Sequence, residues 1–205
     1  MTQNNVKKLK IAITGGYASG KSSVLTRFFE RGFKTYSADT IYKDLLKNEE
    51  FVLKICEILG VPPQKIDGKL TLNKKAVSNL VFNNKEKLNK LNSFTHNRVY
   101  EVINDIYRSS IDSKLVFEIP LLFESGKEGD FDIVIVVMKN TEDRAKCGAE
   151  RDNISIDEAY LRIKNQYNYD NVSKSEHTLI YNDDSVEELY AKVDRVIEDI
   201  ERKIS

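Results

Sequence analysis

The sequence has no tryptophan, only two cysteines and three prolines, and no excess of charge of either sign in its 205 residues. Cys56 and Cys147 are too far apart to form a redox pair or a zinc-type motif, so a reducing compartment, the cytoplasm, is expected. The 32 basic and 32 acidic residues balance, which argues against a general nucleic-acid-binding surface but leaves room for a local basic pocket. We therefore expect no nucleic-acid partner.

Long hydrophobic runs are also missing. The longest candidates, residues 119–123 and 133–138, have the length of a strand, whereas a membrane helix needs roughly 18 apolar residues. Residues 1–10 are polar and then basic, and the apolar run over residues 9–13 is too short for a signal peptide. With nine glycines and three prolines the chain lacks a linker-like segment. These absences predict one soluble domain with no membrane partner.

The chain does contain short β-branched apolar segments that alternate with amphipathic ones. Strands are expected over residues 9–14, 33–36, 114–119, 132–138 and 178–181. Helices are expected over residues 22–31, with Gly32 as the stop signal, and from Thr141, Ser155 and Ser185, the last two opening with capping boxes. This alternation indicates an α/β fold, with an open parallel sheet covered by helices on both faces.

Two further segments complete the expected fold. Residues 39–109 are helical in pattern with interruptions near Gly60 and at Asp67-Gly68, and their little strand character predicts a helical insertion. The terminal helix should bury one apolar face. The residues expected on that face are Val186, Leu189, Val193, Val196, Ile197 and Ile200.

A phosphate-binding loop follows the first expected strand and opens the first expected helix. It matches the pattern G-x-x-x-x-G-K-[ST]. Its residues are Gly15, Gly16, Tyr17, Ala18, Ser19, Gly20, Lys21 and Ser22, with Ser23 next to them. Glycines let successive N–H groups point inward at an anion, Lys21 reaches the β- and γ-phosphates, and the Ser22 hydroxyl can ligate Mg²⁺. The loop predicts nucleotide binding, although it does not by itself define a reaction.

Missing motifs narrow the class of nucleotide-binding protein. The chain carries neither an N-K-x-D base-reading motif nor a D-x-x-G switch, which argues against a GTPase. It has no ABC-type signature, and it is short for a motor or a helicase. A small phosphotransferase remains.

Asp39 ends the segment Tyr36-Ser37-Ala38-Asp39 after the second expected strand. In an open parallel sheet, the carboxyl ends of the strands face the ligand crevice, so this carboxylate should share an edge with the phosphate loop. There it can accept the proton of a hydroxyl that attacks the γ-phosphate. The alternative is that Asp39 only caps a helix beginning at Thr40.

Four segments together resemble the dephospho-CoA kinase family. They are Gly15–Ser22, the ending at Asp39, the stretch Phe117–Glu124 and the pair Arg151-Asp152. The pentapeptide Pro120–Glu124 after a strand is the most discriminating of them, and the similarity extends over nearly the whole chain. The resemblance implies a kinase that transfers the ATP γ-phosphate to the ribose 3′-hydroxyl of dephospho-CoA, giving CoA and ADP in the last step of CoA biosynthesis.

The resemblance also implies a P-loop kinase-like fold with a helical substrate-binding insertion and a helical lid. The single domain would have a core of residues 8–39, 111–140 and 176–205. The substrate lobe would span residues 40–110 and the lid residues 141–175.

Site residues carry over from the family one by one. Asp39 becomes the base, and the acceptor-side wall is formed by Pro120, Leu121, Leu122 and Glu124. Glu118 is implied to hold Mg²⁺ through water, with an ordinary ion pair as the alternative. His96 matches a family histidine usually followed by proline, but Asn97 follows it here, so His96 either touches substrate or is a buried helical histidine. Gln166 is implied to support the lid or the acceptor.

The lid departs from the family pattern. Arginines are present at residues 144, 151 and 162, but Cys147 stands where many relatives have arginine, and Tyr169 replaces another basic residue. We expect Arg151 to stabilise charge on the transferring phosphoryl group, the alternative being a solvated helix arginine. Cys147 is interpreted as a small filler in preference to a reactive thiol. Asn182, just past the last strand, lies where related kinases hold adenine by backbone contacts.

Two other functions stay open at this point. One is a different small-molecule kinase, acting on a nucleoside or a nucleoside monophosphate. The other is a nucleotide sensor without catalysis, for which the altered lid would be the reason. The intact Lys21, Ser22 and Asp39 argue against the sensor.

Overall fold

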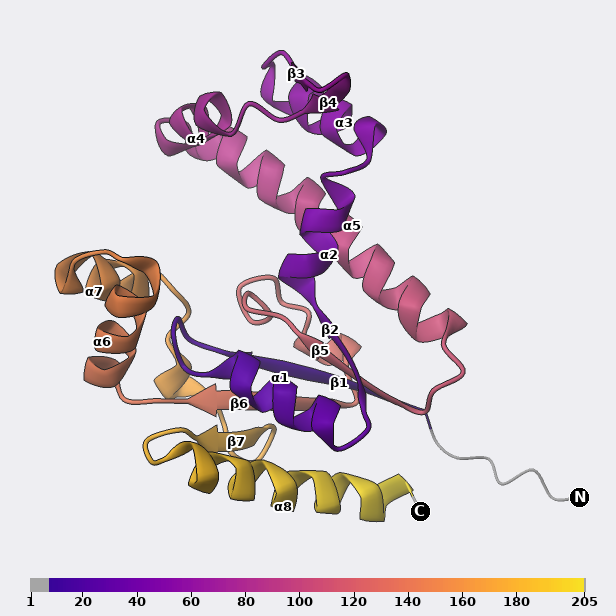
Figure 1. The fold of residues 1–205 in the computed structure, drawn as a ribbon, viewed down its shortest axis with the longest axis vertical. Helices are drawn as coiled ribbons and strands as arrows, with labels where there is room; N and C mark the ends of the chain where they lie inside the picture. Colours follow the sequence, from indigo (N-terminus) through magenta and orange to yellow (C-terminus); the bar gives the residue numbers. More distant parts are fainter. Residues whose placement is uncertain (1–7, 205) are drawn as a thin grey trace, which may run out of the picture. The chain divides into compact units, whose positions relative to one another are not determined.

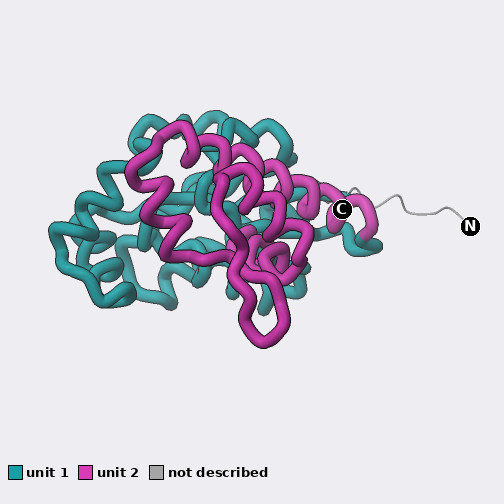
Figure 2. The backbone as a smooth tube through the Cα atoms, turned by 90° about the horizontal axis from the view of Figure 1, so that it is seen from above, with its two compact units in different colours: residues 1–37, 110–205 teal, residues 38–109 magenta. Residues whose placement is uncertain are grey.

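The computed structural model describes residues 8–204, which form two compact units (Figure 2). Unit 1 combines the residues up to Ser37 with those from Ser110 onward, and unit 2 comprises Ala38–Ser109. Unit 2 is therefore one continuous insertion between two strands of unit 1. Within residues 8–204, no helix is long and apolar enough to cross a membrane.

Unit 1 is built on a five-stranded sheet in which every neighbouring pair is parallel. Its strands, in spatial order, are β2 (Lys34–Ser37), β5 (Lys114–Glu118), β1 (Leu9–Gly15), β6 (Ile133–Met138) and β7 (Thr178–Tyr181). The register places Glu118 opposite Ile13, and Gly15 opposite Val137. The carboxyl ends of the strands therefore meet at one edge of the sheet, and the predicted α/β class is confirmed.

Alternate residues of β1 make one face of this sheet apolar. Leu9, Ile11 and Ile13 are buried in a cluster with α1 (Lys21–Glu30) and α8 (Val186–Ile204), which lie side by side in Figure 1. The predicted apolar face of α8 is correct from Leu189 to Ile200 but wrong for Val186, which is 56% exposed. That residue belongs to the first turn, before the helix packs on the cluster.

The end of α1 shows how local sequence directs the chain into the sheet. The Phe33 N–H donates to Phe28 O and the Gly32 N–H donates to Phe29 O, which is a Schellman motif. Gly32 has φ 84°, as predicted for a helix stop. The rings of Phe28 and Phe33 meet edge to face at 5.0 Å, so the same turn that ends the helix also seeds the core.

Two helices follow β6 in unit 1, within residues 141–175, the segment predicted to be the lid. They are α6 (Thr141–Asp152) and α7 (Ile156–Lys164), with short 3-10 turns at Glu128–Asp130 and Tyr169–Asn171 before and after them. The predicted capping box at Ser155 is confirmed, because the Ser155 side chain and Glu158 bond reciprocally. Asn153, with φ 52°, makes the tight turn between the helices.

Unit 2 contains four helices and a hairpin. The helices are α2 (Ala38–Leu45), α3 (Glu49–Leu59), α4 (Lys74–Phe82) and α5 (Lys85–Ser109), and they pack around Phe51, Ile55 and Leu59. The predicted helical insertion is interrupted, at the predicted Asp67-Gly68, by a hairpin that the prediction did not include: β3 (Gln64–Ile66) and β4 (Lys69–Thr71) pair antiparallel. Asp67 and Gly68 have φ 49° and 81°, as a two-residue hairpin turn requires, and Asp-Gly is a known signal for that turn.

Candidate active site

The phosphate loop joins β1 to α1 at the carboxyl edge of the sheet. Gly15, Ala18 and Gly20 have φ 146°, 56° and 94°, which turns successive backbone N–H groups in a way that regular structure does not allow. A Cβ atom on Gly15 would collide with Val137 O of the neighbouring strand. Glycine at this position therefore lets the loop leave the sheet without breaking the pairing of β1 with β6.

Lys21 and Ser19 hold the polar interior of this loop. The Lys21 ammonium donates to Gly15 O at 3.0 Å and to Gly16 O at 2.9 Å, and the residue is only 9% exposed. The Ser19 hydroxyl is buried and has no hydrogen-bond partner among the described residues. Because a buried hydroxyl is costly without a partner, this loop is built for a polar ligand.

Asn182 supports the loop from the end of β7. Its side-chain amide donates to Ser19 O at 2.8 Å, and it lies so close to Gly20 that a Cβ atom there would collide with it. The backbone N–H of Asn182 donates to Met138 O at 2.8 Å. Asn182 is thus adjacent to the loop, and its N–H is engaged by the sheet in this structure. Adenine binding at this segment stays a prediction.

Tyr17, in the phosphate loop, is bound to α6. Its single hydroxyl hydrogen is shared between Asp152 Oδ2 at 2.6 Å and Gly148 O at 3.0 Å. The guanidinium groups of Arg151 and Arg162 lie 5.0 and 5.6 Å from the centre of its ring. Burial and the neighbouring carboxylate raise the pKa of the Tyr17 hydroxyl, so it is a neutral donor at physiological pH.

Asp152 is the carboxylate that Tyr17 and the two arginines share. It accepts from Arg151 Nε at 2.8 Å and pairs with Arg162 at 2.5 Å as well as with Tyr17. The hydrogen bonds from Arg151 and then Tyr17 hold the pKa of this carboxyl well below its usual range. Arg151, the predicted phosphoryl-stabilising residue, is 58% exposed and engaged with Asp152. Its catalytic role stays a prediction.

Arg144 and Gln166 lie directly at the loop. Gln166 Oε1 accepts from the Tyr17 N–H at 2.5 Å and from an Arg144 Nη at 3.4 Å, while Arg144 Nε donates to Tyr17 O at 2.9 Å. Gln166 thereby joins the loop to α6, and its predicted contact with the acceptor stays a prediction. Burial lowers the pKa of Arg144, against the opposing effect of Tyr169 and Asp170.

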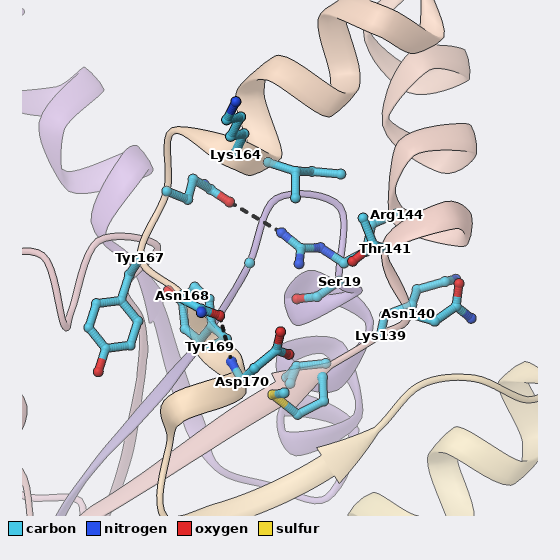
Figure 3. Close-up of a pocket in the computed structure, with 15 residues that line it drawn as sticks. Ser19, Lys139, Asn140, Thr141, Arg144, Lys164, Tyr167, Asn168, Tyr169 and Asp170 are labelled. Carbon is cyan, nitrogen blue, oxygen red and sulfur yellow. Dashed lines mark hydrogen bonds between the residues drawn. The ribbon is translucent and has the colours of Figure 1, made fainter.

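These residues border a pocket of about 330 Å³ within unit 1 (Figure 3). The phosphate loop contributes Gly16 and Ser19, and the strand β6 and the helix α6 contribute one wall. The end of α7 and the segment after it contribute the opposite wall. The members of the walls are Val137, Met138, Lys139, Asn140, Thr141, Arg144, Ile163, Lys164, Gln166, Tyr167, Asn168, Tyr169 and Asp170. A polar, cationic pocket beside a phosphate loop suits a nucleotide.

The predicted acceptor-side wall follows β5. Leu121 is 40% exposed and Glu124 is exposed, whereas Leu122 is fully buried beneath the turn. Pro120 O accepts from the Tyr169 hydroxyl at 3.3 Å, and Glu124 Oε1 accepts from the Tyr167 N–H at 3.1 Å. The contacts fasten this turn to the segment after α7. Leu121 and Glu124 are the members of the predicted wall whose side chains reach the surface.

Tyr169 stands where a basic residue was expected, and it does structural work there. It is 5% exposed, and its hydroxyl lies 3.4 Å from the hydroxyl of Thr14 on β1. Burial raises its pKa to about 12. Tyr169 is therefore a neutral group in the floor of the pocket, and the cation expected at this position is absent from it.

Asp39 and His96 belong to unit 2. Asp39 is exposed and lies in the first turn of α2, which begins at Ala38, so the alternative of a cap for a helix starting at Thr40 is wrong. His96 is half-buried on α5. Their predicted contacts with substrate stay predictions.

The residues predicted to hold Mg²⁺ are an oxygen donor set. Ser22 is exposed in the first turn of α1, and Glu118 ends β5, in register with Ile13 of the strand that leads into the loop. Across residues 8–204, no three or more His, Cys, Asp or Glu side chains are grouped to hold a metal by themselves. Hydroxyl and carboxylate oxygens fit Mg²⁺, which keeps several waters and binds phosphates together with one or two protein groups.

Sequence reasoning missed two features of this site. The Tyr17 ring fills the space beside Gly148 of α6, where a Cβ atom would collide with it. Arg144 reaches the loop, although Arg151 was the expected residue. A signal for the first was available, because a glycine inside a helix is unfavourable unless something packs against it.

Comparisons with known proteins place these features in context. The family model for dephospho-CoA kinase matches residues 9–188. A dephospho-CoA kinase of Fusobacterium nucleatum is 35% identical over 190 residues, covering 93% of this chain and 97% of the relative. One of Chlorobaculum tepidum is 32% identical over 198 residues, covering 94% and 95%. The solved dephospho-CoA kinase of Campylobacter jejuni is 29% identical with a TM-score of 0.69, covering 95% of this chain and 98% of its own.

Proposed function

The chain belongs to the dephospho-CoA kinase family, and on this premise we propose that its phosphate loop, Asp39 and lid transfer the ATP γ-phosphate to the ribose 3′-hydroxyl of dephospho-CoA. The products are CoA and ADP. One observation carries the proposal: the family match over residues 9–188 coincides with a complete phosphate loop whose lysine and buried serine are in place.

The phosphate loop binds the nucleotide. Backbone N–H groups between Gly15 and Ser23, together with the first turn of α1, cradle the β- and γ-phosphates. Lys21 exchanges its contacts with Gly15 O and Gly16 O for phosphate oxygens. Its positive charge then lies beside the oxygen between the β- and γ-phosphorus atoms, which leaves with ADP. The Ser19 hydroxyl gains a partner inside the loop. The pocket beside the loop and Asn182 receives the rest of the nucleotide.

Asp39 accepts the proton of the 3′-hydroxyl. Phosphoryl transfer has a loose transition state, so the carboxylate acts mainly by holding the hydroxyl in line with the γ-phosphorus. Asp39 follows Ser37, the last pairing residue of β2, by two positions. The strand β2 ends at the same edge of the sheet as the phosphate loop. Leu121 and Glu124 bound the acceptor beside that edge, and His96 and Gln166 contribute further contacts.

Ser22 and Glu118 hold Mg²⁺ in this proposal, and the ion supplies charge neutralisation on the phosphates. Arg151 adds a cation from the lid when it exchanges Asp152 for phosphate. The lid helices exclude water, which matters because an open site would hydrolyse ATP. Cys56 and Cys147 are both free, which supports a cytoplasmic location. In this proposal the enzyme acts on small molecules and has no nucleic-acid or membrane partner.

A coupled assay of ADP release, with dephospho-CoA present and absent, tests the function. We expect turnover only with the acceptor and a product phosphorylated at the ribose 3′ position, as identified by ³¹P NMR. Nucleosides and nucleoside monophosphates serve as competing acceptors. Faster turnover with one of these would assign a different kinase, and tight ATP binding without turnover on any acceptor would assign a sensor.

A further inference from the structure

Two cations converge on Gly16 of the phosphate loop. Lys21 Nζ donates to Gly16 O at 2.9 Å. The Arg144 guanidinium covers the α-carbon of Gly16 so closely that a Cβ atom there would collide with it. Because the lysine of this motif marks the place of the β- and γ-phosphates, Arg144 lies at the phosphate-binding part of the loop. Figure 3 shows its side chain extending from α6 toward the loop.

Arg144 has hydrogen-bond donors left over, and no carboxylate of the described residues is hydrogen-bonded to it. It donates from Nε to Tyr17 O and from one Nη to Gln166 Oε1 at 3.4 Å, out of the five N–H groups of a guanidinium. It forms no ion pair with any carboxylate in the described part of the chain. The charge of Asp170 acts on Arg144, but no carboxylate within residues 8–204 is hydrogen-bonded to it; such a half-buried cation is unfavourable, and a triphosphate beside it would supply a directly bonded counter-ion.

Arg151 differs on each of these counts. It is 58% exposed, it is paired with Asp152 at 2.8 Å, and its guanidinium rests over the Tyr17 ring. To touch a phosphate it must give up both contacts. Arg144 needs no such exchange, since it is already held against the loop by Tyr17 O.

We propose that Arg144 is a catalytic residue of this enzyme, contacting the ATP phosphates and stabilising charge on the transferring phosphoryl group together with Lys21. The proposal rests on the proposed kinase function. It also accounts for the altered lid: Cys147, where the family resemblance led us to expect arginine, is three residues along α6 from Arg144, so both lie on one face of that helix. In this chain the cation that reaches the loop from α6 is Arg144, about one helical turn before Cys147.

The reaction itself is unchanged by this assignment. The 3′-oxygen of the ribose forms a bond to the γ-phosphorus, the bond from that phosphorus to the β-bridging oxygen breaks with its electron pair going to ADP, and the hydroxyl proton goes to Asp39. Arg144 exchanges no atom. It donates N–H groups to the oxygens on which negative charge accumulates.

The test compares three arginine variants that carry the same substitution. Arg144→Gln should lower kcat for dephospho-CoA-dependent ADP release at least about a hundredfold, in the range seen when one positioned donor or arginine is removed. Arg151→Gln should lower it less. Arg195→Gln, on the exposed side of α8, is the matched control and should leave kcat within about twofold of the parent.

Binding without an acceptor separates this proposal from the kinase function. By calorimetry with Mg²⁺, Arg144→Gln should weaken the binding of a non-hydrolysable ATP analogue about tenfold and leave the binding of AMP, which lacks the β- and γ-phosphates, nearly unchanged. An equal loss of affinity for both ligands would show that Arg144 contacts the adenosine part of the nucleotide. No loss of affinity, together with a kcat near the parent's, would show that Arg144 is not part of the site. Either result overturns the proposal. A parent protein without acceptor-dependent turnover would refute the function, while the binding data would still decide on Arg144.

Two further variants guard against a merely misfolded loop. Arg144→Lys keeps the charge but lacks the planar fork, so its kcat should fall between those of the parent and Arg144→Gln. Cys147→Arg in the parent should raise kcat less than twofold, because Arg144 already supplies the cation. In the Arg144→Gln background the same change should recover at least tenfold. A large gain in the parent, or none in the double variant, would contradict the assignment.

Discussion

The two units of the molecule bury different kinds of groups. Unit 1 buries Lys10, Thr14, Ser19 and Lys21, and the last three lie in or next to the phosphate loop. In unit 2 the buried polar residue is Thr95, whose hydroxyl donates to Leu91 O of its own helix at 2.8 Å. Unit 1 thus keeps the Ser19 hydroxyl in place for a ligand, at a cost in stability, whereas the core cluster of unit 2 around Ile55 is apolar. From this difference we expect the phosphates to be bound by unit 1.

The strongest test of this division is Asp39→Asn, because Asp39 is the one proposed catalytic group in unit 2. Loss of the proton acceptor should lower kcat by about 10³- to 10⁴-fold while the affinity for ATP changes little. Steady-state kinetics and calorimetry measure the two quantities. Asp44→Asn, an exposed carboxylate on the same helix, is the control. Turnover within about threefold of the parent, roughly 0.7 kcal/mol of barrier, would rule out Asp39 as the base.

Lys21→Ala removes the buried cation of unit 1. We expect kcat to fall about 10²- to 10³-fold and ATP binding to weaken, since the charge on the β- and γ-phosphates loses its partner. The same ADP-release assay and calorimetry apply, with Lys203→Ala on the exposed face of α8 as the control. If Lys21→Ala had the same kinetics as the parent, the phosphate loop would have no part in catalysis.

Ile55→Ala probes the packing of unit 2. Ile55 is fully buried between Phe51 and Leu59, and truncation should lower the free energy of unfolding by about 3 kcal/mol in chemical denaturation. ATP affinity should stay unchanged, because the phosphate site belongs to unit 1. Leu53→Ala, at a residue 45% exposed on the same helix, should cost far less. A large loss of ATP affinity in Ile55→Ala, measured where the variant is fully folded, would contradict the assignment of the phosphate site to unit 1 alone.

Asp152→Asn gives the smallest effect and sharpens the view of the lid. The carboxyl has a lower pKa in the folded protein than in the unfolded chain, so its contribution to stability is complete above the unfolded value of about 4 and is lost as the pH falls toward the folded value. Asp152→Asn should therefore lower Tm at pH 7, and the difference from the parent should shrink below pH 4. Thermal melts at both pH values test this. A difference that grows in acid would contradict the assigned pKa direction.

Sequence patterns predicted the parallel sheet and most helix boundaries because these depend on local signals. Glycine at 32 ends α1, Ser155 caps α7, and the β-branched runs form the inner strands. The hairpin of unit 2 was missed because its strands are three residues each, too short for a periodic pattern, although Asp67-Gly68 carried a turn signal.

The candidate site was predictable only in part. The phosphate loop is contiguous in sequence, so its residues and order could be read directly. The contacts that complete it join residues more than a hundred positions apart, such as Asn182 with Ser19 and Arg144 with Tyr17. Which of the lid arginines reaches the loop depends on the angle and rotation of α6, and no local pattern in the chain encodes that rotation.

Tyr17 and Gly148 form a pair with a consequence for how this enzyme can vary. The ring of a residue in the nucleotide loop occupies the space that a side chain on α6 would need. Any sequence change that enlarges residue 148 must shrink residue 17, and a smaller residue at 17 would leave a hole that only a larger neighbour on the helix could fill. Engineering of the loop and of the lid helix must therefore proceed jointly, as a matched set of two substitutions.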